Sequence, residues 1–381
     1  MRLLLFLLAI CAGIVWIGAR AEAQNYPWCA QYGSMGGLNC GFTTLQQCQA
    51  TVTGMGGFCE VNTQYQPAPG SHRSTGSRRR WLALLQQARH LFEMSQMKLS
   101  LYTFADEAFV PAIAALVNSA RRNGFSGTIH IGSPEPLSIS RQIPEGIKFH
   151  SLGPSDYWPG NRKTELLLKH PSEHVVLLDA DIIIADPTFL SRLEKWVEVA
   201  PVVIVSNLVS SIDYRRYAWA KRLGRPARPQ HWPSRYYNGG FLACDFERDR
   251  MLVEQWDSLI RSTLVAPGAL WTDVDFPLSD QDILNALLQD WEAPLVGLSP
   301  PDIWASAAPH YPFLRIGTFG SPAILHCSGF GKSWQLTAPP LRPPHAYDLA
   351  WYNEVVRNPA PIKLNINMSA TLRDWFEQGA Q

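Results

Sequence analysis

Short apolar runs alternate with amphipathic segments along most of the chain after residue 97. The runs are rich in β-branched and aromatic residues, which is typical of strands, and they span residues 98–104, 128–131, 148–150, 174–178 and 202–205. Between them, residues 109–122 and 161–168 carry apolar residues at helical spacing. Strands that alternate with helices predict a mainly parallel sheet with helices on both faces, and therefore an α/β fold.

Two later segments add to this pattern. Residues 280–288 begin with acidic residues and continue with apolar ones, which predicts a helix. Residues 214–233 are rich in Arg, Trp and Pro, and here we expect an insertion or an irregular loop of the kind that can form a lid.

The N-terminus has the pattern of an export signal. Arg2 is followed by an apolar stretch over residues 3–17, and Ala21-Glu22-Ala23 matches an A-x-A cleavage site, so we expect a signal peptide over residues 1–23. The stretch is short for a transmembrane helix, and an uncleaved anchor, which would bring membrane contact, is the alternative. The sequence predicts a periplasmic or secreted protein, or a cytoplasmic one if the true start lies near Met97.

Residues 24–65 form a small cysteine-bearing segment. Its four cysteines, in a chain predicted to be exported, indicate a framework of two disulfides whose pairing the spacing leaves open: Cys29, Cys40, Cys48 and Cys59. Zinc is the weaker alternative, because the cysteines do not occur as C-x-x-C pairs and no His lies among them. The segment resembles a domain of unknown function found in short secreted α-proteobacterial proteins, a resemblance that implies no activity.

The remaining boundaries follow from composition. Residues 66–96 are expected to be a linker, flexible over 66–80 and followed by a short amphipathic helix. Residues 97–360 would form the large α/β domain, and residues 361–381 a C-terminal tail. The charges balance, with 33 Lys and Arg against 32 Asp and Glu, so nothing indicates a nucleic-acid surface. Neither a dinucleotide-binding fingerprint nor a P-loop motif is present.

The acidic triplet Asp179-Ala180-Asp181 directly follows the predicted strand 174–178. The carboxyl ends of strands are where open α/β sheets bind ligands. Two carboxylates one residue apart suit Mg²⁺ or Mn²⁺ that also carries a diphosphate. The alternative is that one Asp caps a turn and the other is a solvated strand end.

Two further segments carry candidate chemistry. His326 ends a predicted strand, and a Gly-rich turn with Gly329 and Lys332 follows it. A neutral imidazole can join two carboxylates as a metal ligand, and a Lys on such a turn can contact phosphate. The paired glycines after Asn238 allow a close approach of the backbone beside a strand. Each segment alone can also be a packed strand end or a tight turn.

Taken together, four motifs resemble glycosyltransferase family eight, the glycogenin and galactosyltransferase-like group: LLDADIIIADP, YYNGGFLACD, SDQDILNALL and ILHCSGFGKSW, within about residues 97–334. The resemblance implies a GT-A fold, Rossmann-like, and retention of anomeric configuration. The sequence departs from the family pattern in two places. The family usually has Asn-Ala-Gly where this chain has Asn238-Gly239-Gly240, and Lys-Pro-Trp where this chain has Lys332-Ser333-Trp334.

The resemblance also implies roles for single residues. Asp179, Asp181 and His326 would hold Mn²⁺ (or Mg²⁺). Contacts to the nucleotide and its sugar would come from Thr103, Asp106, Arg162, Asn238, Gly329 and Lys332. Asp280, Gln281 and Lys332 would be catalytic, with Lys332 stabilising the leaving diphosphate.

The resulting hypothesis is a retaining, metal-dependent glycosyltransferase. It would move a sugar from a nucleotide-sugar donor, expected to be a UDP-sugar, to a glycan or lipid-linked acceptor. One alternative is a catalytically inactive secreted binding or structural protein, which the export signal favours because nucleotide sugars are normally made in the cytoplasm. Another is a nucleotidyltransferase, which would leave the motif from His326 to Lys332 without a purpose.

Overall fold

The computed structural model describes residues 26–32, 37–52, 58–62, 65, 97–141, 144–206, 213–227, 229, 235–263, 275–291, 293, 295–298, 304–306, 322–328 and 331–378. The predicted signal peptide and the linker with its short helix lie outside these residues. The described chain belongs to two compact units, one before and one after residue 73. None of the described helices is long and apolar enough to cross a membrane.

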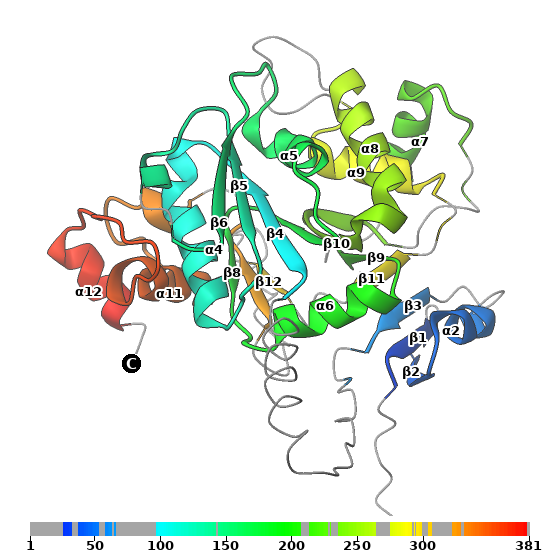
Figure 1. Ribbon diagram of the computed structural model, residues 1–381, viewed down its shortest axis with the longest axis horizontal. Helices are drawn as coiled ribbons and strands as arrows, with labels where there is room; N and C mark the ends of the chain where they lie inside the picture. The colour runs from blue at the N-terminus through cyan, green and yellow to red at the C-terminus, as the bar shows by residue number, and fades with distance from the viewer. Residues whose placement is uncertain are drawn as a thin grey trace, which may run out of the picture. The chain divides into compact units, whose positions relative to one another are not determined.

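The first unit is a small antiparallel sheet with one helix (blue in Figure 1). Strands β1 (Trp28–Tyr32), β2 (Gly37–Phe42) and β3 (Phe58–Val61) pair in the order β2-β1-β3. Helix α2 (Leu45–Val52) begins with a capping box, in which Thr44 Oγ1 accepts from Gln47 N and Gln47 Oε1 accepts from Thr44 N. Disulfides join Cys29 to Cys40 and Cys48 to Cys59, which confirms the predicted pair of bridges.

These bridges give a first prediction. Alkylation of the unreduced protein should leave all four bridged cysteines unlabelled by mass spectrometry. Cys244 and Cys327 are buried free thiols and should become labelled only on unfolding. Burial raises the pKa of Cys327 to about 12, which further lowers its reactivity. Free thiols at Cys29 or Cys48 would instead indicate a reducing compartment.

The second unit is built on a seven-stranded sheet. Its order is β11-β9-β10-β7-β4-β5-β6, and the strands are β4 (Leu99–Phe104), β5 (Ile129–Ser133), β6 (Ile147–Ser151), β7 (His174–Leu178), β9 (Val202–Ser206), β10 (Tyr237–Asp245) and β11 (Leu295–Leu298). β10 runs antiparallel to both neighbours, and every other pair is parallel. The α/β class and the mainly parallel sheet are thereby confirmed.

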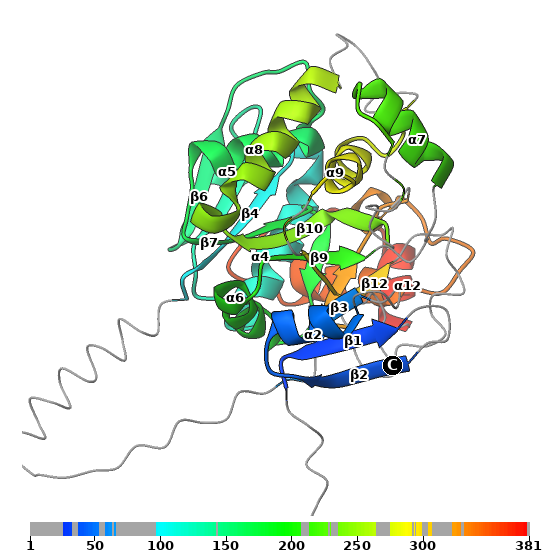
Figure 2. The same cartoon turned by 90° about the vertical axis from the view of Figure 1, so that its right-hand side faces the viewer.

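Helices cover both faces of this sheet (Figures 1 and 2). On one face α5 (Lys163–Lys169), α8 (Phe246–Thr263) and α9 (Asp280–Leu288) pack over a core that includes Leu242 of β10. Phe241, the preceding residue, contacts Phe189 of α6 (Phe189–Val199). Successive strand residues face opposite sides, so α6 covers the other face. α4 (Val110–Arg122) packs against β8 (Ile182–Ile184), which pairs with β13 (Ile324–His326), itself beside β12 (Trp304–Ser306).

The segment after residue 213 corrects one expectation. Residues Asp213–Arg222 form helix α7, in a segment where we expected an insertion or an irregular loop. Trp219 explains the helix, since its ring is buried and stacks on Phe276 at 6.3 Å, and its Nε1 donates to the carbonyl of Asp275. Asp275 is 56 residues after Trp219 in the sequence. The Arg-rich pattern of the segment therefore does not reveal that Trp219 is buried.

The C-terminal segment packs onto the same unit. α11 (Ala346–Tyr352) leads into η7 (Asn353–Arg357), and α12 (Ala370–Gln378) returns so that Phe376 stacks on Tyr352 at 4.9 Å. Asn118 of α4 donates to the carbonyls of Glu354 and Ile362 and accepts from Ile362 N. Most of the segment predicted as a tail, residues 361–381, is thus held by the large unit.

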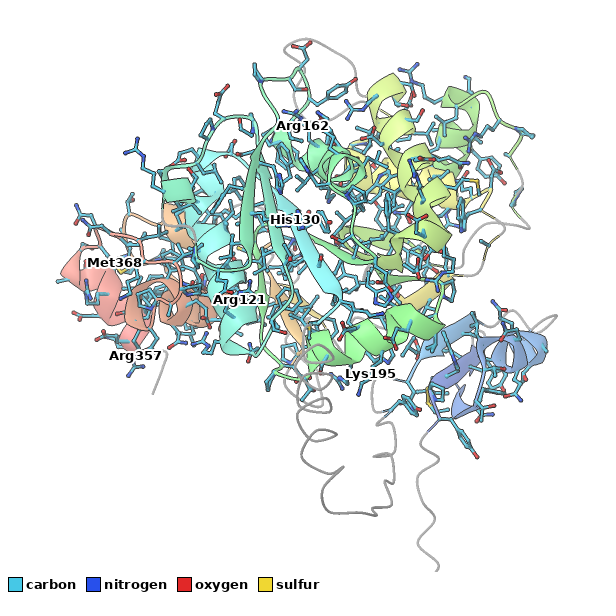
Figure 3. The ribbon with its side chains drawn as sticks, in the orientation of Figure 1. Arg121, His130, Arg162, Lys195, Arg357 and Met368 are labelled. Atoms are coloured by element: carbon cyan, nitrogen blue, oxygen red, sulfur yellow. A yellow bond between two sulfur atoms is a disulfide. The ribbon has the colours of Figure 1, made fainter. Side chains whose placement is uncertain are left out.

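Four rings form a stack across one edge of the sheet. Tyr102 stacks on His130 at 4.4 Å, His130 Nδ1 lies 3.1 Å from His150 Nε2, and His150 packs on His170 at 3.9 Å. Figure 3 labels His130. Burial, followed by the neighbouring imidazoles and Lys148, lowers the pKa of His130 to about 3, and similar causes lower that of His150 to about 4.

This stack predicts an acid-sensitive fold. The folded state keeps both rings neutral, whereas an unfolded chain protonates them near about pH 6.5. Their contribution to stability is therefore fully present above about pH 6.5 and is lost as the pH falls toward about 4. Thermal melts should show a larger drop in Tm between about pH 7.5 and about pH 5 for the wild type than for His150→Phe. An equal drop in both proteins would contradict this account.

Candidate active site

The acidic triplet lies where three strands of the second unit come together. β7 ends at Leu178, and the backbone N–H of Asp179 then donates to the carbonyl of Gly240 in β10 at 2.9 Å. The carbonyl of Asp181 accepts from the N–H of Cys327, the residue after β13. The backbone thus fixes the triplet between β10 and β13, and it stands at the carboxyl end of the central strand, as predicted.

The three predicted metal ligands lie together. One ligand atom each of Asp179, Asp181 and His326 lies within 4.8 Å of the others. His326 Nε2 is 3.1 Å from Asp181 Oδ1 and 3.6 Å from Asp179 Oδ2. A side chain at position 240 would fill this space, since a Cβ built on Gly240 would lie 2.4 Å from Asp179 Oδ2. Two carboxylates and an imidazole with an open approach suit a divalent cation such as Mn²⁺.

Lys332 pairs with the same cluster. Its Nζ lies 2.5 Å from Asp181 Oδ2 and donates to the carbonyl of Cys327. Burial alone would raise the pKa of Asp181, but His326 and Lys332 together lower it well below its usual range. Asp181 is therefore an ionised carboxylate shared by an imidazole and an ammonium group.

A second cation, Lys163, was not among the residues predicted from the sequence. Its Nζ lies 2.8 Å from Asp179 Oδ1, 2.8 Å from Asp280 Oδ2 and 2.7 Å from the carbonyl of Gly239. Burial would lower the pKa of this lysine, which is only 3% exposed, but the two carboxylates raise it above its ordinary value. Lys163 therefore links Asp179, one of the candidate metal ligands, to Asp280 on the opposite wall of the site.

Arg162, predicted as a donor contact, does not face the cavity. Its Nε donates to Glu165 Oε2 at 2.8 Å, its NH1 donates to the carbonyl of Gly153, and its guanidinium lies over the ring of Phe104. Successive residues at a helix start point about 100° apart, so the side chain next in sequence, Lys163, turns toward the acidic cluster instead. The expected contact of Arg162 with the donor is therefore corrected. Arg162 instead stabilises the loop that precedes α5.

The predicted sugar-pocket residues form a hydrogen-bonded wall. Gln281 Oε1 accepts from Gly239 N at 3.0 Å, and Gln281 Nε2 donates to the hydroxyl of Tyr236. A Cβ at position 239 would lie 2.9 Å from Gln281 Cα, which accounts for glycine where the resembling family has alanine. Burial raises the pKa of Asp280 to about 6, with Lys163 opposing the shift. Asn238 Oδ1 accepts from Gly240 N within β10, beside this wall.

Ser279 holds this wall in a rare backbone conformation. Its φ of 53° makes it the only non-glycine residue with positive φ in the described part of the chain. Its Oγ donates to Asn161 Oδ1 at 2.7 Å, and both side chains are buried. Such strained residues often occur at functional sites, and here the strain directs Asp280 and Gln281 toward the acidic cluster.

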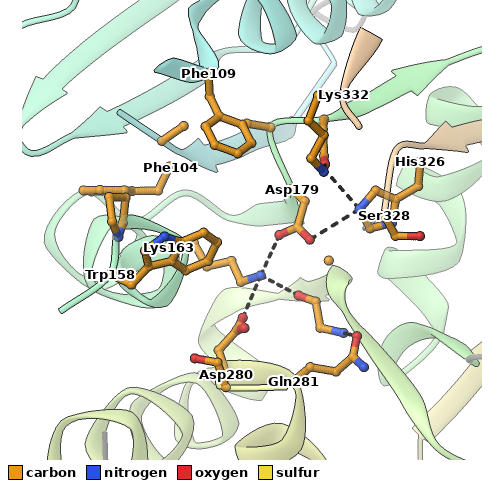
Figure 4. A pocket seen from close by; sticks show the side chains of 18 of the residues that line it. Phe104, Phe109, Trp158, Lys163, Asp179, Asp280, Gln281, His326, Ser328 and Lys332 are labelled. Carbon is orange, nitrogen blue, oxygen red and sulfur yellow. Dashed lines mark hydrogen bonds and ion pairs between the residues drawn. The ribbon is translucent and has the colours of Figure 1, made fainter. Parts of the chain in front are cut away.

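These groups line one cavity of about 550 Å³ (Figure 4). Eight of the predicted site residues are in its wall: Asp106, Asp179, Asp181, Asn238, Asp280, Gln281, His326 and Lys332. Thr103 is fully buried in β4 and is not in the wall, so the expected contact with the nucleotide or its sugar does not follow from its position. Gly329 lies outside the described residues.

Comparisons with known proteins were made for the whole chain. The family model described as a protein of unknown function, DUF3551, matches residues 1–74. No curated protein sequence matches the chain.

Among solved structures, an active-site mutant of LgtC covers 62% of this chain and 89% of its own, at 14% identity and a TM-score of 0.42. The galactosyltransferase LgtC in complex with donor and acceptor sugar analogues has the same coverage and TM-score, at 15% identity. The bifunctional glycosyltransferase WbbM covers 62% of this chain and 46% of its own, at 13% identity and a TM-score of 0.39.

Proposed function

We propose that the second unit is a retaining, metal-dependent glycosyltransferase with a GT-A fold, which uses a nucleotide-sugar donor, a UDP-sugar by preference. The observation that carries this proposal is one cavity that holds three kinds of group. These are the ligand cluster of Asp179, Asp181 and His326, the cation Lys332, and the wall of Asp280 and Gln281. The acceptor would be a glycan or a lipid-linked glycan.

The chemistry follows from what the reaction must stabilise. A departing nucleoside diphosphate develops negative charge on its phosphate oxygens. A divalent cation held by Asp179, Asp181 and His326 supplies Lewis acidity toward those oxygens when it is bound. Lys332, beside the same cluster, supplies a second positive charge for the leaving group.

Asp280 and Gln281 lie on the other wall, where the sugar would be. Positive charge develops at the anomeric carbon as the leaving group departs, and the carboxylate of Asp280 and the amide oxygen of Gln281 can stabilise it. Lys163 holds Asp280 and Asp179 in a fixed relation. Tyr236 and Gly239 orient the amide of Gln281, so little reorganisation is needed during the reaction.

We also propose that the protein is exported to the periplasm or beyond the cell. The A-x-A site at Ala21–Ala23 and the two disulfides support this, because disulfides persist in oxidising compartments. The enzyme would then need nucleotide sugar in that compartment, and the inactive binding protein is the alternative that avoids this need.

Calorimetry with UDP tests the proposed function. UDP should bind in Mn²⁺ and lose most of its affinity in EDTA, and the Asp181→Asn variant should lose it in both buffers. Mn²⁺-dependent release of UDP from a UDP-hexose should accompany this binding. Asp186→Asn is a matched control, because Asp186 is a nearby acidic residue that pairs with Arg192 outside the cavity. Equal UDP affinity in Mn²⁺ and in EDTA would remove the proposed metal-bridged donor site.

A further inference from the structure

The cavity has an apolar rim that its charged groups do not account for. The described residues include several large hydrophobic side chains that are exposed, and two of these line the cavity. They are Trp158, which is 43% exposed, and Leu278, which is 39% exposed. Leaving such surface in water has a cost in free energy, so two exposed side chains at one cavity mouth indicate a binding surface.

Local backbone structure holds the indole in place. A Cβ built on Gly160 would lie 1.7 Å from Cζ3 of Trp158, so the ring rests directly on the backbone of its own loop. Pro159, between the two, restricts the loop further. Position 160 therefore has to be glycine for Trp158 to lie where it does.

A buried hydrogen bond links the loops that carry the two rim residues. Asn161, three residues after Trp158, accepts from Ser279, the residue after Leu278. The strained φ of Ser279 lies at the same junction. Trp158 and Leu278 are thus held in a fixed relation to each other.

The rim lies on the sugar side of the cavity. Leu278 is two residues before Asp280, and Trp158 is five residues before Lys163, whose Nζ contacts Asp280. In Figure 4, Trp158 and Lys163 lie on one side of Asp179, and Lys332 and His326 lie on the other. The diphosphate would occupy the Lys332 side and the donor sugar the wall of Asp280 and Gln281, which leaves the exposed rim for the acceptor.

The chemistry of this surface selects the kind of substrate. An indole face and a leucine side chain match the C–H face of a pyranose ring. Asp280 and Gln281 line the same cavity and offer oxygens to its hydroxyl groups. The carboxylates on this wall disfavour an anionic ring. We propose that Trp158, assisted by Leu278, is the acceptor platform, on which a neutral pyranose ring stacks beside Asp280. This inference rests on the proposed transferase function.

Kinetics of the full exported chain test the platform. UDP release from a UDP-hexose in Mn²⁺ is measured with and without methyl glycosides of glucose, galactose and mannose. At least one glycoside should stimulate release by the wild type. Trp158→Ala should raise KM for that glycoside at least about tenfold, the equivalent of one lost aromatic contact, and change KM for the UDP-hexose less than about twofold.

Two more variants separate stacking from a general disturbance. Gly160→Ala keeps the indole but displaces it, and should raise KM for the glycoside in the same direction. Trp158→Phe should recover part of the affinity. Tyr217→Ala removes an aromatic that is 52% exposed on α7, away from the cavity, and should change neither constant.

Each outcome supports or overturns the platform. If Trp158→Ala raises KM for the UDP-hexose instead, Trp158 is a donor contact and the proposal is wrong. If the wild type hydrolyses the UDP-hexose but no glycoside stimulates it, a neutral pyranose is not the acceptor and the proposal is wrong while the proposed function stands. An absence of Mn²⁺-dependent UDP release altogether would contradict the proposed function.

Discussion

Lys163→Met is expected to destabilise the second unit by about 3–5 kcal/mol, the usual effect of removing one partner from a buried ion pair. The loss of the ammonium group leaves the buried Asp280 and the partly exposed Asp179 facing each other without the cation between them. The carbonyl of Gly239 also loses a donor. UDP release should fall strongly at temperatures where the variant is still folded, because both carboxylates would then be free to move.

Chemical denaturation measures the stability change, and a second lysine provides the control. Lys169 pairs with Glu165 on the surface, with its side chain 51% exposed, so Lys169→Met should change stability by less than about 1 kcal/mol. Combining Lys163→Met with Asp280→Asn should restore part of the lost stability, since one uncompensated charge is removed. If Lys163→Met is as mild as Lys169→Met, Lys163 does not hold the two carboxylates together.

Site residues could be placed from the sequence where a residue type with a clear chemical role directly follows an apolar run that predicts a strand. Asp179 and Asp181 follow a run of apolar residues that forms a central strand, so their place at the sheet edge follows from the pattern alone. The pairing of β13 with β8 brings His326 beside these two carboxylates. In the sequence, only the resemblance to the glycosyltransferase family implied this contact. The antiparallel direction of β10 was not predicted, because direction depends on pairing partners that the pattern of one strand does not specify.

Lys163 shows why other parts of the site could not be predicted. Its partner Gly239 is 76 residues away in the sequence, and no sequence motif around Lys163 indicates a buried cation. One signal was available, however. Lys163 stands at helical spacing from Leu166 and Leu167, so it lies on the buried face of α5. A lysine on an apolar face needs a buried partner, whereas Arg162, one position earlier, finds its partners within its own loop.

His326→Ala is expected to weaken Mn²⁺ binding by at least about 10–100-fold, because even residues that only support metal ligands have effects of this size. The imidazole is the one nitrogen donor of the cluster, and its loss leaves two carboxylates to hold the cation. Calorimetric titration with Mn²⁺ in the absence of nucleotide measures this directly. Thermal melts without metal serve as the control, because His326 is buried and its removal also has a packing cost.

Lys332→Ala should behave in the opposite way in the same titration. Lys332 Nζ pairs with Asp181 Oδ2, so it competes with Mn²⁺ for that carboxylate. Its removal should leave Mn²⁺ affinity equal to that of the wild type or raise it, while kcat for UDP release falls because the leaving phosphate loses a positive charge. Lys332→Arg should not restore kcat fully, since a planar guanidinium replaces a compact ammonium group. A loss of Mn²⁺ affinity in Lys332→Ala as large as that in His326→Ala would mean that Lys332 only holds Asp181 in position, and the separation between metal ligand and phosphate contact would be wrong.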